Sequence, residues 1–404
     1  MRILHTSDWH LGRKLCGQER ADEFRRFLDW LTDTLICERA DALVVAGDVF
    51  DSYTPPLWAQ SLYYRFLTGL SRTPCRSAVI VAGNHDSAAL LDSPRELLDR
   101  LDVHVVGAPA QDPGAEIFEL PDAQGKTGAL CCAVPFLRSR DLCGAMSGED
   151  ADAIARAELD GFAKHYADVC ALAETRRAGR DVPIVALGHC FAAGGAVRDD
   201  DGVRDLAVGS LGAVPLSAFP ENVDYLALGH LHMPQTCGGR ESRRYSGAPL
   251  CMGFGEAGQK KQVCVVDFDG RAASVRAVDV PVWQEILRLK GSFDEIAAAL
   301  SELERSGRSV WVEADCADEG ARGLNDRIRE LTGDGGAVKI LRVKVADAGL
   351  AEVFSGAGDL NEDWSPREVF RLYLSEHQIE GEEAEALTGA YLEALEAMRT
   401  EAAR

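Results

Sequence analysis

Five short apolar runs in this chain each stop at a turn that carries aspartate, asparagine or histidine. The clearest run, residues 78–82, ends at Gly83 and is followed directly by Asn84, His85 and Asp86. Short apolar runs bounded by glycine are typical of strands buried on both faces of a parallel sheet. Parallel strands present their carboxyl ends at one edge, so we expect the five turns to lie together. The other four turns are Asp8-Trp9-His10, Gly47-Asp48, Gly188-His189 and Gly229-His230-Leu231-His232.

The first hundred residues alternate between such strands and amphipathic helices. Apolar residues recur at helical spacing between residues 24 and 35 and again between residues 62 and 70. Strand, helix, strand, helix and strand in this order predict right-handed βαβ units. Ser93, followed by Pro94 and Glu96, is typical of a capping box with proline at the first helical position, so a short helix is expected to begin there.

The next part of the chain is expected to complete the same domain. Glycine and proline break residues 103–137 into short strands, which predicts an antiparallel part of the sheet. A long helix is expected at residues 151–177. Further on, the Asp269-Gly270 pair between apolar runs predicts a β-hairpin.

A chain of 404 residues is long enough for two or three domains. Residues 1–280 are expected to form the first and largest. Residues 281–346 follow the order strand, helix, strand, helix, strand and are expected to form a compact α+β domain. Residues 347–363 are rich in glycine and acidic residues and are interpreted as a linker. Residues 364–404 contain two short amphipathic helices that are expected to dock on this chain or on a partner.

Composition narrows the class of protein. The chain reaches Asp8 before an apolar signal region could form, and no stretch has the length of a transmembrane helix, so a cytoplasmic protein without membrane contact is predicted. The 12 cysteines form no Cys-x-x-Cys pair, which favours free thiols over structural zinc. The formal net charge of −22 argues against wrapping nucleic acid by bulk electrostatics, but it does not exclude nucleic acid as a substrate.

Seven side chains at the turns are oxygen or imidazole donors, and none is a thiolate. They are Asp8, His10, Asp48, Asn84, His189, His230 and His232. Such donors suit Mn²⁺, Fe²⁺, Mg²⁺ or Zn²⁺ in an open site. Seven ligands are too many for one small cation with open positions, so two cations that share a bridging carboxylate are predicted. These cations would polarise a phosphate and lower the pKa of a bridging water, and His85 could protonate the leaving oxygen.

Each of these residues also has an ordinary structural explanation. A single histidine after a glycine is commonly a hydrogen-bonded structural residue, and Asn84 and Asp86 could simply form a turn. The joint pattern of five turns therefore carries the prediction. The histidines elsewhere in the chain are interpreted as structural or surface residues: His5, His104, His165 and His377.

Taken in order, the patterns Asp-x-His, Gly-Asp-x-x-Asp, Gly-Asn-His-Asp, Gly-His and Gly-His-x-His resemble the calcineurin-like metallophosphoesterase superfamily. The resemblance covers roughly residues 1–270 and is specific as an ensemble, although each motif alone is weak. It implies an α/β fold in which a β-sandwich is flanked by helices. Further segments are similar to one group in this superfamily, the nuclease subunits of bacterial complexes with an ATPase. They are residues 5–12, 47–51, 134–138, 229–232 and 245–249. In these subunits a capping domain follows the phosphoesterase domain, and residues 281–346 match it in position.

This resemblance implies roles for individual residues. One metal ion would be held by Asp8, His10, Asp48 and His232, the other by Asp48, Asn84, His189 and His230, and His85 would be the catalytic histidine. Archaeal and eukaryotic members carry a histidine in place of Asp51, so no role is transferred to that residue.

The resemblance also implies an activity and a partner. The activity is Mn²⁺-dependent cleavage of DNA, with 3′→5′ exonuclease action on duplex ends and endonuclease action on hairpins or single strands. The partner is an ATPase with a long coiled coil, which the C-terminal helices bind. Two copies of this chain could form a homodimer within a heterotetramer.

Two other functions stay open at this point. A phosphodiesterase or phosphatase that acts on small molecules or phosphoproteins would use the same cluster, and the net charge of −22 favours it. A scaffold for an ATPase would use mainly the C-terminal helices. The extra domain at residues 281–346 favours the DNA nuclease.

Overall fold

The computed structural model describes most of the chain up to residue 345. The described ranges are 1–143, 151–195, 212–318, 324–332 and 336–345, together with residues 374, 387, 388 and 391. The predicted linker and the predicted docking helices lie outside the described residues, apart from those last four positions. Within the described ranges, no helix combines the length and the apolar character that crossing a membrane requires.

The first sheet has the strand order β12-β11-β1-β2-β3-β4. Its parallel strands are β1 (Arg2–Thr6), β2 (Ala42–Ala46), β3 (Ser77–Val81) and β4 (Val103–Val106), and its antiparallel strands are β11 (Gln262–Asp269) and β12 (Ala272–Asp279). Helix α1 (Ala21–Glu38) connects β1 to β2, and α2 (Leu57–Gly69) lies between β2 and β3. The predicted βαβ units and the predicted hairpin are confirmed.

The second sheet has the order β5-β6-β7-β8-β10-β9. Its strands are β5 (Ile117–Pro121), β6 (Thr127–Ala133), β7 (Ile184–His189), β8 (Tyr225–Gly229), β9 (Gln235–Cys237) and β10 (Arg240–Tyr245). The four inner strands run parallel, and β5 and β9 pair antiparallel at the two edges. Two helices precede β7: the short α5 (Ser139–Leu142) and the long α6 (Ala151–Arg177), which has the predicted bounds.

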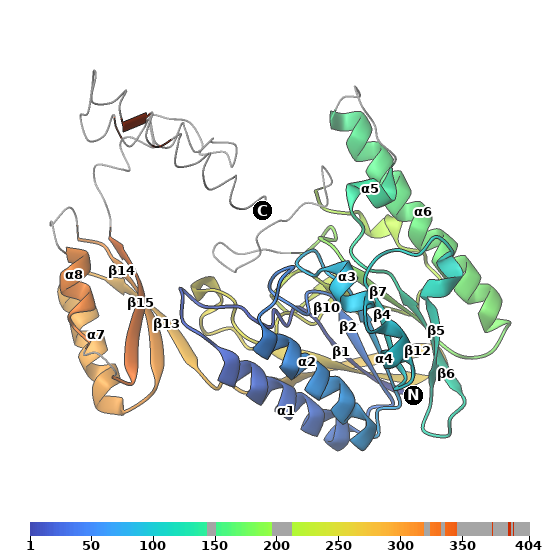
Figure 1. Ribbon diagram of the computed structural model, residues 1–404, viewed down its shortest axis with the longest axis horizontal. Helices are drawn as coiled ribbons and strands as arrows, with labels where there is room; N and C mark the ends of the chain where they lie inside the picture. Colours follow the sequence, from blue (N-terminus) through green and yellow to red (C-terminus); the bar gives the residue numbers. More distant parts are fainter. Residues whose placement is uncertain are drawn as a thin grey trace.

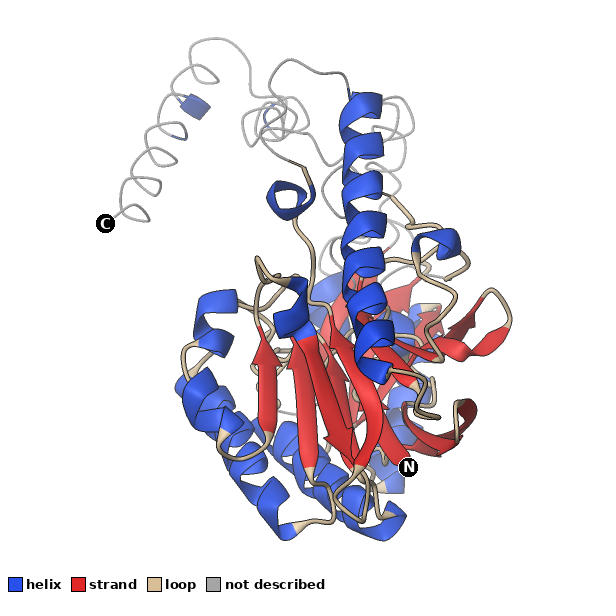
Figure 2. Ribbon diagram, turned by 90° about the vertical axis from the view of Figure 1, so that its right-hand side faces the viewer, coloured by secondary structure: helices blue, strands red, loops and turns tan. Residues whose placement is uncertain are grey.

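The two sheets pack face to face, and helices cover their outer faces (Figure 1, Figure 2). Val44 of β2 and Val185 of β7 belong to the fully buried core between the sheets. Phe27 of α1 packs in the core on the outer face of the first sheet, and Phe162 of α6 packs on the second. Each such side chain contributes roughly 1.5–3 kcal/mol through burial. The predicted β-sandwich flanked by helices is confirmed.

A separate three-stranded sheet follows the sandwich and is drawn in orange in Figure 1. Its strands β13 (Glu285–Gly291), β14 (Val310–Cys316) and β15 (Val338–Val345) are all parallel, and α7 (Phe293–Ser306) and α8 (Leu324–Arg329) connect them. The predicted order of elements is confirmed, and the crossover helices explain why no strand is reversed. A small apolar cluster with Leu15, Phe254, Ile286 and Trp311 packs this sheet against the sandwich. The boundary at residue 280 stays a prediction.

The predicted capping box at Ser93 is wrong. Ser93 has right-handed helical angles and ends α3 (Ala88–Asp92), so it is not placed to cap the following helix. Helix α4 (Arg95–Asp99) begins after Pro94 without a side-chain capping bond. The capping serine is Ser87, whose hydroxyl accepts a backbone N–H in the first turn of α3.

The antiparallel prediction for residues 103–137 is correct for β5 and β6 but wrong for β4. That strand pairs parallel with β3, because α3 and α4 carry the chain back across the sheet before β4 begins. Its buried apolar residues are typical of a parallel strand. The change from parallel to antiparallel pairing therefore comes at β5, in the second sheet.

Candidate metal centre

The turns that follow β1 and β2 are held side by side by backbone hydrogen bonds. The N–H of Asp8 donates to the carbonyl of Gly47 at 3.0 Å, and the N–H of His10 donates to the carbonyl of Asp48 at 2.9 Å. The turn after β3 joins them, because the N–H of His85 donates to Oδ1 of Asp48 at 2.9 Å. Three neighbouring parallel strands thus deliver their turns to one point, as the sequence predicts.

Four of the predicted ligands have backbone conformations that residues with a side chain rarely adopt. The φ angle is 53° at Asp8, 46° at His10, 50° at Asp48 and 100° at His230. Such strained angles persist only where the surroundings hold them, and they gather at functional sites. The crowding also explains Gly83, because a β-carbon at that position would overlap Oδ1 of Asp48.

One half of the cluster contains Asp8, His10 and His232, whose side chains are all buried. Nε2 of His10 lies 3.1 Å from Nε2 of His232 and 3.5 Å from Oδ2 of Asp48. Oδ1 of Asp8 accepts the N–H of His230 at 2.8 Å, which ties the turn after β1 to the turn after β8. This half therefore draws its residues from both sheets.

The other half contains Asp48, Asn84, His189 and His230. Nε2 of His189 lies 3.2 Å from Oδ2 of Asp48 and 3.0 Å from Oδ1 of Asn84. Nδ1 of His230 lies 3.2 Å from the same Asn84 oxygen. Because Oδ2 of Asp48 is close to both His10 and His189, it joins the two halves. The structure therefore brings all seven predicted ligands together.

The donor atoms of this cluster fit divalent cations. Nε2 of His230 is buried and has no hydrogen-bond partner within the described residues, although buried polar atoms are normally satisfied. Oxygen and imidazole donors without a thiolate are the ligands that Mn²⁺, Mg²⁺ and Fe²⁺ accept. Among the described residues, three sets of side chains lie close enough to hold an ion: Asp8 with His10 and His232, Asp8 with Asp48 and His189, and His10 with Asp51 and His85.

Burial and charge together set the protonation of the cluster. Burial lowers the pKa of His10 to about 4 and that of His230 to about 3, so both rings are neutral near pH 7. Burial also acts to lower the pKa of His189, but the charge of Asp48 outweighs it and raises that pKa to about 9. The His189 partner in turn holds the pKa of Asp48 well below its usual range, against the effect of burial. The neutral imidazoles of His10 and His230 and the ionised carboxylate of Asp48 are metal-binding forms, whereas His189 has to release its proton before it can bind a cation.

The partly exposed His85 lies at the side of this cluster. Its Nδ1 is 3.1 Å from the backbone carbonyl of Asp51, and its ring centre is 5.0 Å from that of His10. The hydrogen bond to the carbonyl orients the ring and leaves Nε2 for proton exchange. The carboxylate of Asp51 lies 3.0 Å from Arg13 and 3.4 Å from Nδ1 of His10, so it helps to orient that ring.

Sequence reasoning treated Asp86 as a turn residue and missed its structural role. Its fully buried carboxylate accepts the N–H groups of Val49 at 3.0 Å, Phe50 at 2.9 Å and Gly83 at 2.9 Å. Burial, with the nearby charge of Asp48, raises the pKa of Asp86 to about 7. This side chain therefore holds the turns after β2 and β3 together. In the sequence, its position directly after His85 was the one indication of this role.

Sequence reasoning also missed Glu256, which lies on the short 3₁₀ helix Phe254–Glu256. Its fully buried carboxylate lies 3.2 Å from Nδ1 of His232 and pairs with the buried Lys261. Burial opposes ionisation, but the charge of Lys261 outweighs it and lowers the pKa of Glu256. A carboxylate on the far nitrogen of a histidine is typical of the shell around a metal ligand. Its acidic side chain alone gave no signal, because most glutamates are exposed.

Comparison with known proteins places the chain in a family. Residues 1–234 match the calcineurin-like phosphoesterase family, and residues 282–378 match the type 5 capsule protein repressor C-terminal domain. The chain is 39% identical over 340 residues to the SbcD subunit of the nuclease SbcCD from Escherichia coli K12, with 82% of each protein covered.

Two further relatives carry the same description. The protein of Rhodobacter capsulatus is 39% identical over 317 residues, which cover 75% of this chain and 76% of that protein. The protein of Bacillus subtilis is 35% identical over 324 residues, which cover 78% of each. Since the phosphoesterase match spans more than half of the chain and these relatives match most of it, the chain belongs to the calcineurin-like phosphoesterase family and, within it, to the SbcD group.

Proposed function

We propose that this chain is a DNA nuclease that hydrolyses phosphodiester bonds with two divalent cations, most simply Mn²⁺. The observation that supports the proposal is the convergence of seven side chains with oxygen and nitrogen donors, Asp48 among them, from turns of both sheets. One cation would be held by Asp8, His10, Asp48 and His232, and the other by Asp48, Asn84, His189 and His230.

The side chains have distinct parts in this proposal. When bound, the cations supply Lewis acidity that polarises the scissile phosphate and lowers the pKa of a water at the site. Asp48 contributes the negative charge that both halves of the cluster share. The amide of Asn84 adds an oxygen donor without further negative charge. His85, oriented by the carbonyl of Asp51, donates a proton to the leaving oxygen.

The descriptions of the relatives support a more specific substrate and a partner. Each of them is named as the SbcD component of the nuclease SbcCD, which supports DNA as the substrate and a second kind of chain as the partner. We assign to this chain 3′→5′ exonuclease action on duplex ends and endonuclease action on hairpins and single strands. Its partner would be an SbcC-type coiled-coil ATPase, bound through residues 364–404. The complex, with two copies of each chain, would act in the cytoplasm in DNA repair, recombination and replication.

A cleavage assay tests this proposal. Purified chain with Mn²⁺ is expected to degrade a linear duplex and to open a DNA hairpin, and EDTA is expected to abolish both activities. His85→Ala should reduce cleavage by about 100-fold or more, because it removes the proton donor. The same variant should still bind two Mn²⁺ ions per chain in isothermal titration calorimetry. His104→Ala, which changes a histidine of β4 that is bonded to Asp99, is the matched control.

Three outcomes would contradict parts of the proposal. Hydrolysis of cyclic nucleotides or phosphoproteins without any cleavage of DNA would identify a phosphodiesterase or phosphatase instead. Loss of Mn²⁺ from His85→Ala would show that His85 is a ligand, as its place in the third candidate set allows. Unchanged capture of the ATPase after deletion of residues 364–404 would refute the docking role and leave the nuclease site unaffected.

A further inference from the structure

An exposed aromatic ring lies at the edge of the metal cluster. Tyr53 is 58% exposed, although its hydroxyl donates to the backbone carbonyl of Asn84 at 3.1 Å. The hydroxyl thus fixes the ring to the turn that carries a proposed ligand, while much of the ring surface stays in contact with solvent. A large aromatic side chain held in this way is oriented but not covered, so its ring is available to a ligand.

Arg138 approaches the same ring from the segment that follows β6. Its guanidinium carbon lies 5.9 Å from the centre of the Tyr53 ring, and one guanidinium nitrogen lies 3.5 Å from the carbonyl of Asp86. The segment itself is fixed to the end of β3, because the N–H of Phe136 donates to the carbonyl of Ala82 at 2.8 Å. An aromatic ring and a cation are therefore held next to each other by backbone contacts.

These two side chains bind the residues on either side of the proposed proton donor. Tyr53 contacts the carbonyl of Asn84 and Arg138 approaches that of Asp86, so His85 lies between their two attachment points. His85 is oriented from the same segment as Tyr53, through the carbonyl of Asp51. A substrate whose leaving oxygen reaches His85 therefore passes beside the ring and the guanidinium group.

We propose that Tyr53 and Arg138 form a nucleotide-binding subsite, in which Tyr53 stacks on an unpaired base beside the scissile bond and Arg138 binds an adjacent phosphate. The inference rests on the proposed nuclease function and specifies how the strand is held. An aromatic face stacks on any base, and the N–H groups of arginine match phosphate oxygens. A local subsite of this kind also fits a chain whose net charge of −22 provides no bulk attraction for DNA.

The subsite has a consequence for substrate choice. A base must leave the duplex stack before its face can lie on Tyr53, and unstacking is easiest in hairpin loops, at frayed ends and in single strands. Arg138 carries no information about the base, because phosphate contacts fix the position of a strand without reading its sequence. The pair therefore favours unpaired DNA of any sequence over an intact duplex.

Fluorescence anisotropy with the full-length chain in EDTA tests the subsite without cleavage. The probes are a labelled hairpin with an unpaired loop and a labelled duplex whose ends are closed by linkers that contain no bases. Tyr53→Ala is expected to weaken binding of the looped hairpin about tenfold, as the loss of one base–aromatic stack does. Tyr53→Trp should restore that affinity. Arg138→Ala should weaken binding of the same probe and lower the salt dependence of its affinity by about one phosphate contact.

Matched variants separate stacking from indirect effects. Tyr53→Phe removes only the hydroxyl bond to Asn84: DNA affinity close to that of the wild type supports stacking, and a loss equal to that of Tyr53→Ala overturns it. Leu57→Ala removes an exposed apolar side chain on α2, and Arg76→Ala removes an exposed arginine at the amino end of β3. Both controls should bind DNA like the wild type.

The results also distinguish failure of the subsite from failure of the nuclease. Equal binding of the looped hairpin by wild type and Tyr53→Ala overturns the subsite, and the nuclease proposal stands as long as the wild type cleaves DNA with Mn²⁺. A wild-type chain that cleaves no DNA overturns the nuclease proposal and the subsite with it.

Discussion

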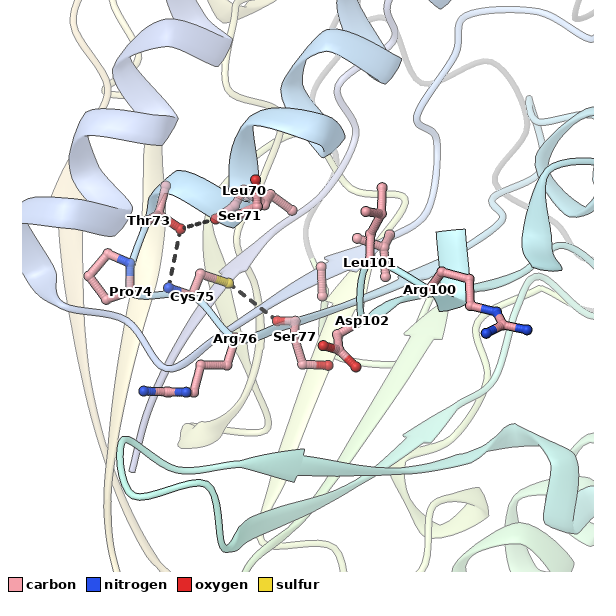
Figure 3. Close-up of a pocket in the computed structure, with 12 residues that line it drawn as sticks. Leu70, Ser71, Thr73, Pro74, Cys75, Arg76, Ser77, Arg100, Leu101 and Asp102 are labelled. Carbon is pink, nitrogen blue, oxygen red and sulfur yellow. Dashed lines mark hydrogen bonds between the residues drawn. The ribbon is translucent and has the colours of Figure 1, made fainter. Parts of the chain in front are cut away.

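The two ends of β3 have different surroundings. At the carboxyl end, the turn that carries Asn84 and His85 meets donor side chains that point toward one another from both sheets. At the amino end lies a cavity of about 430 Å³ (Figure 3). Its lining includes Thr73, Cys75, Ser77 and Asp102. Arg76 and Arg100 extend away from each other on opposite sides of it, so its charged groups do not converge.

This difference shows that a cavity and a functional site are not the same thing. Burial raises the pKa of the Cys75 thiol to about 12, so the amino end holds an unreactive thiol. At the carboxyl end, burial raises the pKa of the Asp86 carboxyl group to about 7 and lowers the pKa of the His230 imidazole to about 3. Strongly shifted groups that lie together on strained turns are typical of functional sites.

The largest expected difference between the two ends comes from removing one carboxylate charge at each. Asp48→Asn keeps the size of the side chain but removes the charge that both halves of the cluster share. We expect activity to fall on the order of 1,000-fold or more and the number of bound Mn²⁺ ions to drop below two. Asp102→Asn is the matched change at the amino end, where φ is 56° and asparagine is tolerated. It should leave Mn²⁺ binding unchanged.

Calorimetric titration with Mn²⁺ measures both variants, and circular dichroism confirms that each is folded. If Asp48→Asn still bound two ions with wild-type affinity, Asp48 would not be the shared ligand. If Asp102→Asn lost Mn²⁺, the two ends of β3 would be coupled, and their contrast would no longer mark the site.

A smaller effect on Mn²⁺ binding is expected from Glu256, which contacts the proposed ligand His232 but is not itself a proposed ligand. Glu256→Leu removes the acceptor for Nδ1 of His232 and should weaken Mn²⁺ binding about 10- to 100-fold. Glu256→Gln retains an oxygen acceptor and should recover part of that loss. Both variants remove the buried negative charge that pairs with Lys261, so they should lose similar amounts of thermal stability. Mn²⁺ affinities that follow thermal stability alone would show that Glu256 is purely structural.

The sequence predicts the carboxyl end of β3 well because its information is local. Each ligand directly follows a run of buried apolar residues, and parallel strands bring such positions to one edge. Asp8, Asp48 and Asn84 follow three neighbouring strands of the first sheet and could therefore be placed near one another from chain order and strand ends alone. The same locality predicts α6 from its helical periodicity over residues 151–177.

The parts that sequence reasoning missed depend on contacts between distant segments. Glu256 reaches His232 only because a 3₁₀ helix after β10 folds back over the cluster, and nothing in its neighbours signals burial. Ser93 has the pattern of a capping residue, but it lies at the carboxyl end of α3, the helix that Ser87 caps. The pairing of Tyr53 with Arg138 likewise joins a turn in the first sheet to a segment of the second. Local sequence patterns do not predict such contacts.

The smallest effect is expected from Cys75, at the amino end of β3. Its Sγ lies 3.3 Å from the carbonyl of Ser77, and its side chain is buried. Cys75→Ala should lower the free energy of unfolding by about 1 kcal/mol and leave DNA cleavage within about twofold of the wild type. Because only a thiolate reacts and burial raises the pKa of Cys75 to about 12, iodoacetamide at pH 8 should label the exposed Cys16 and Cys37 far faster. Mass spectrometry of the labelled peptides measures this order, and rapid labelling of Cys75 with loss of activity would give the amino end a function that its geometry does not indicate.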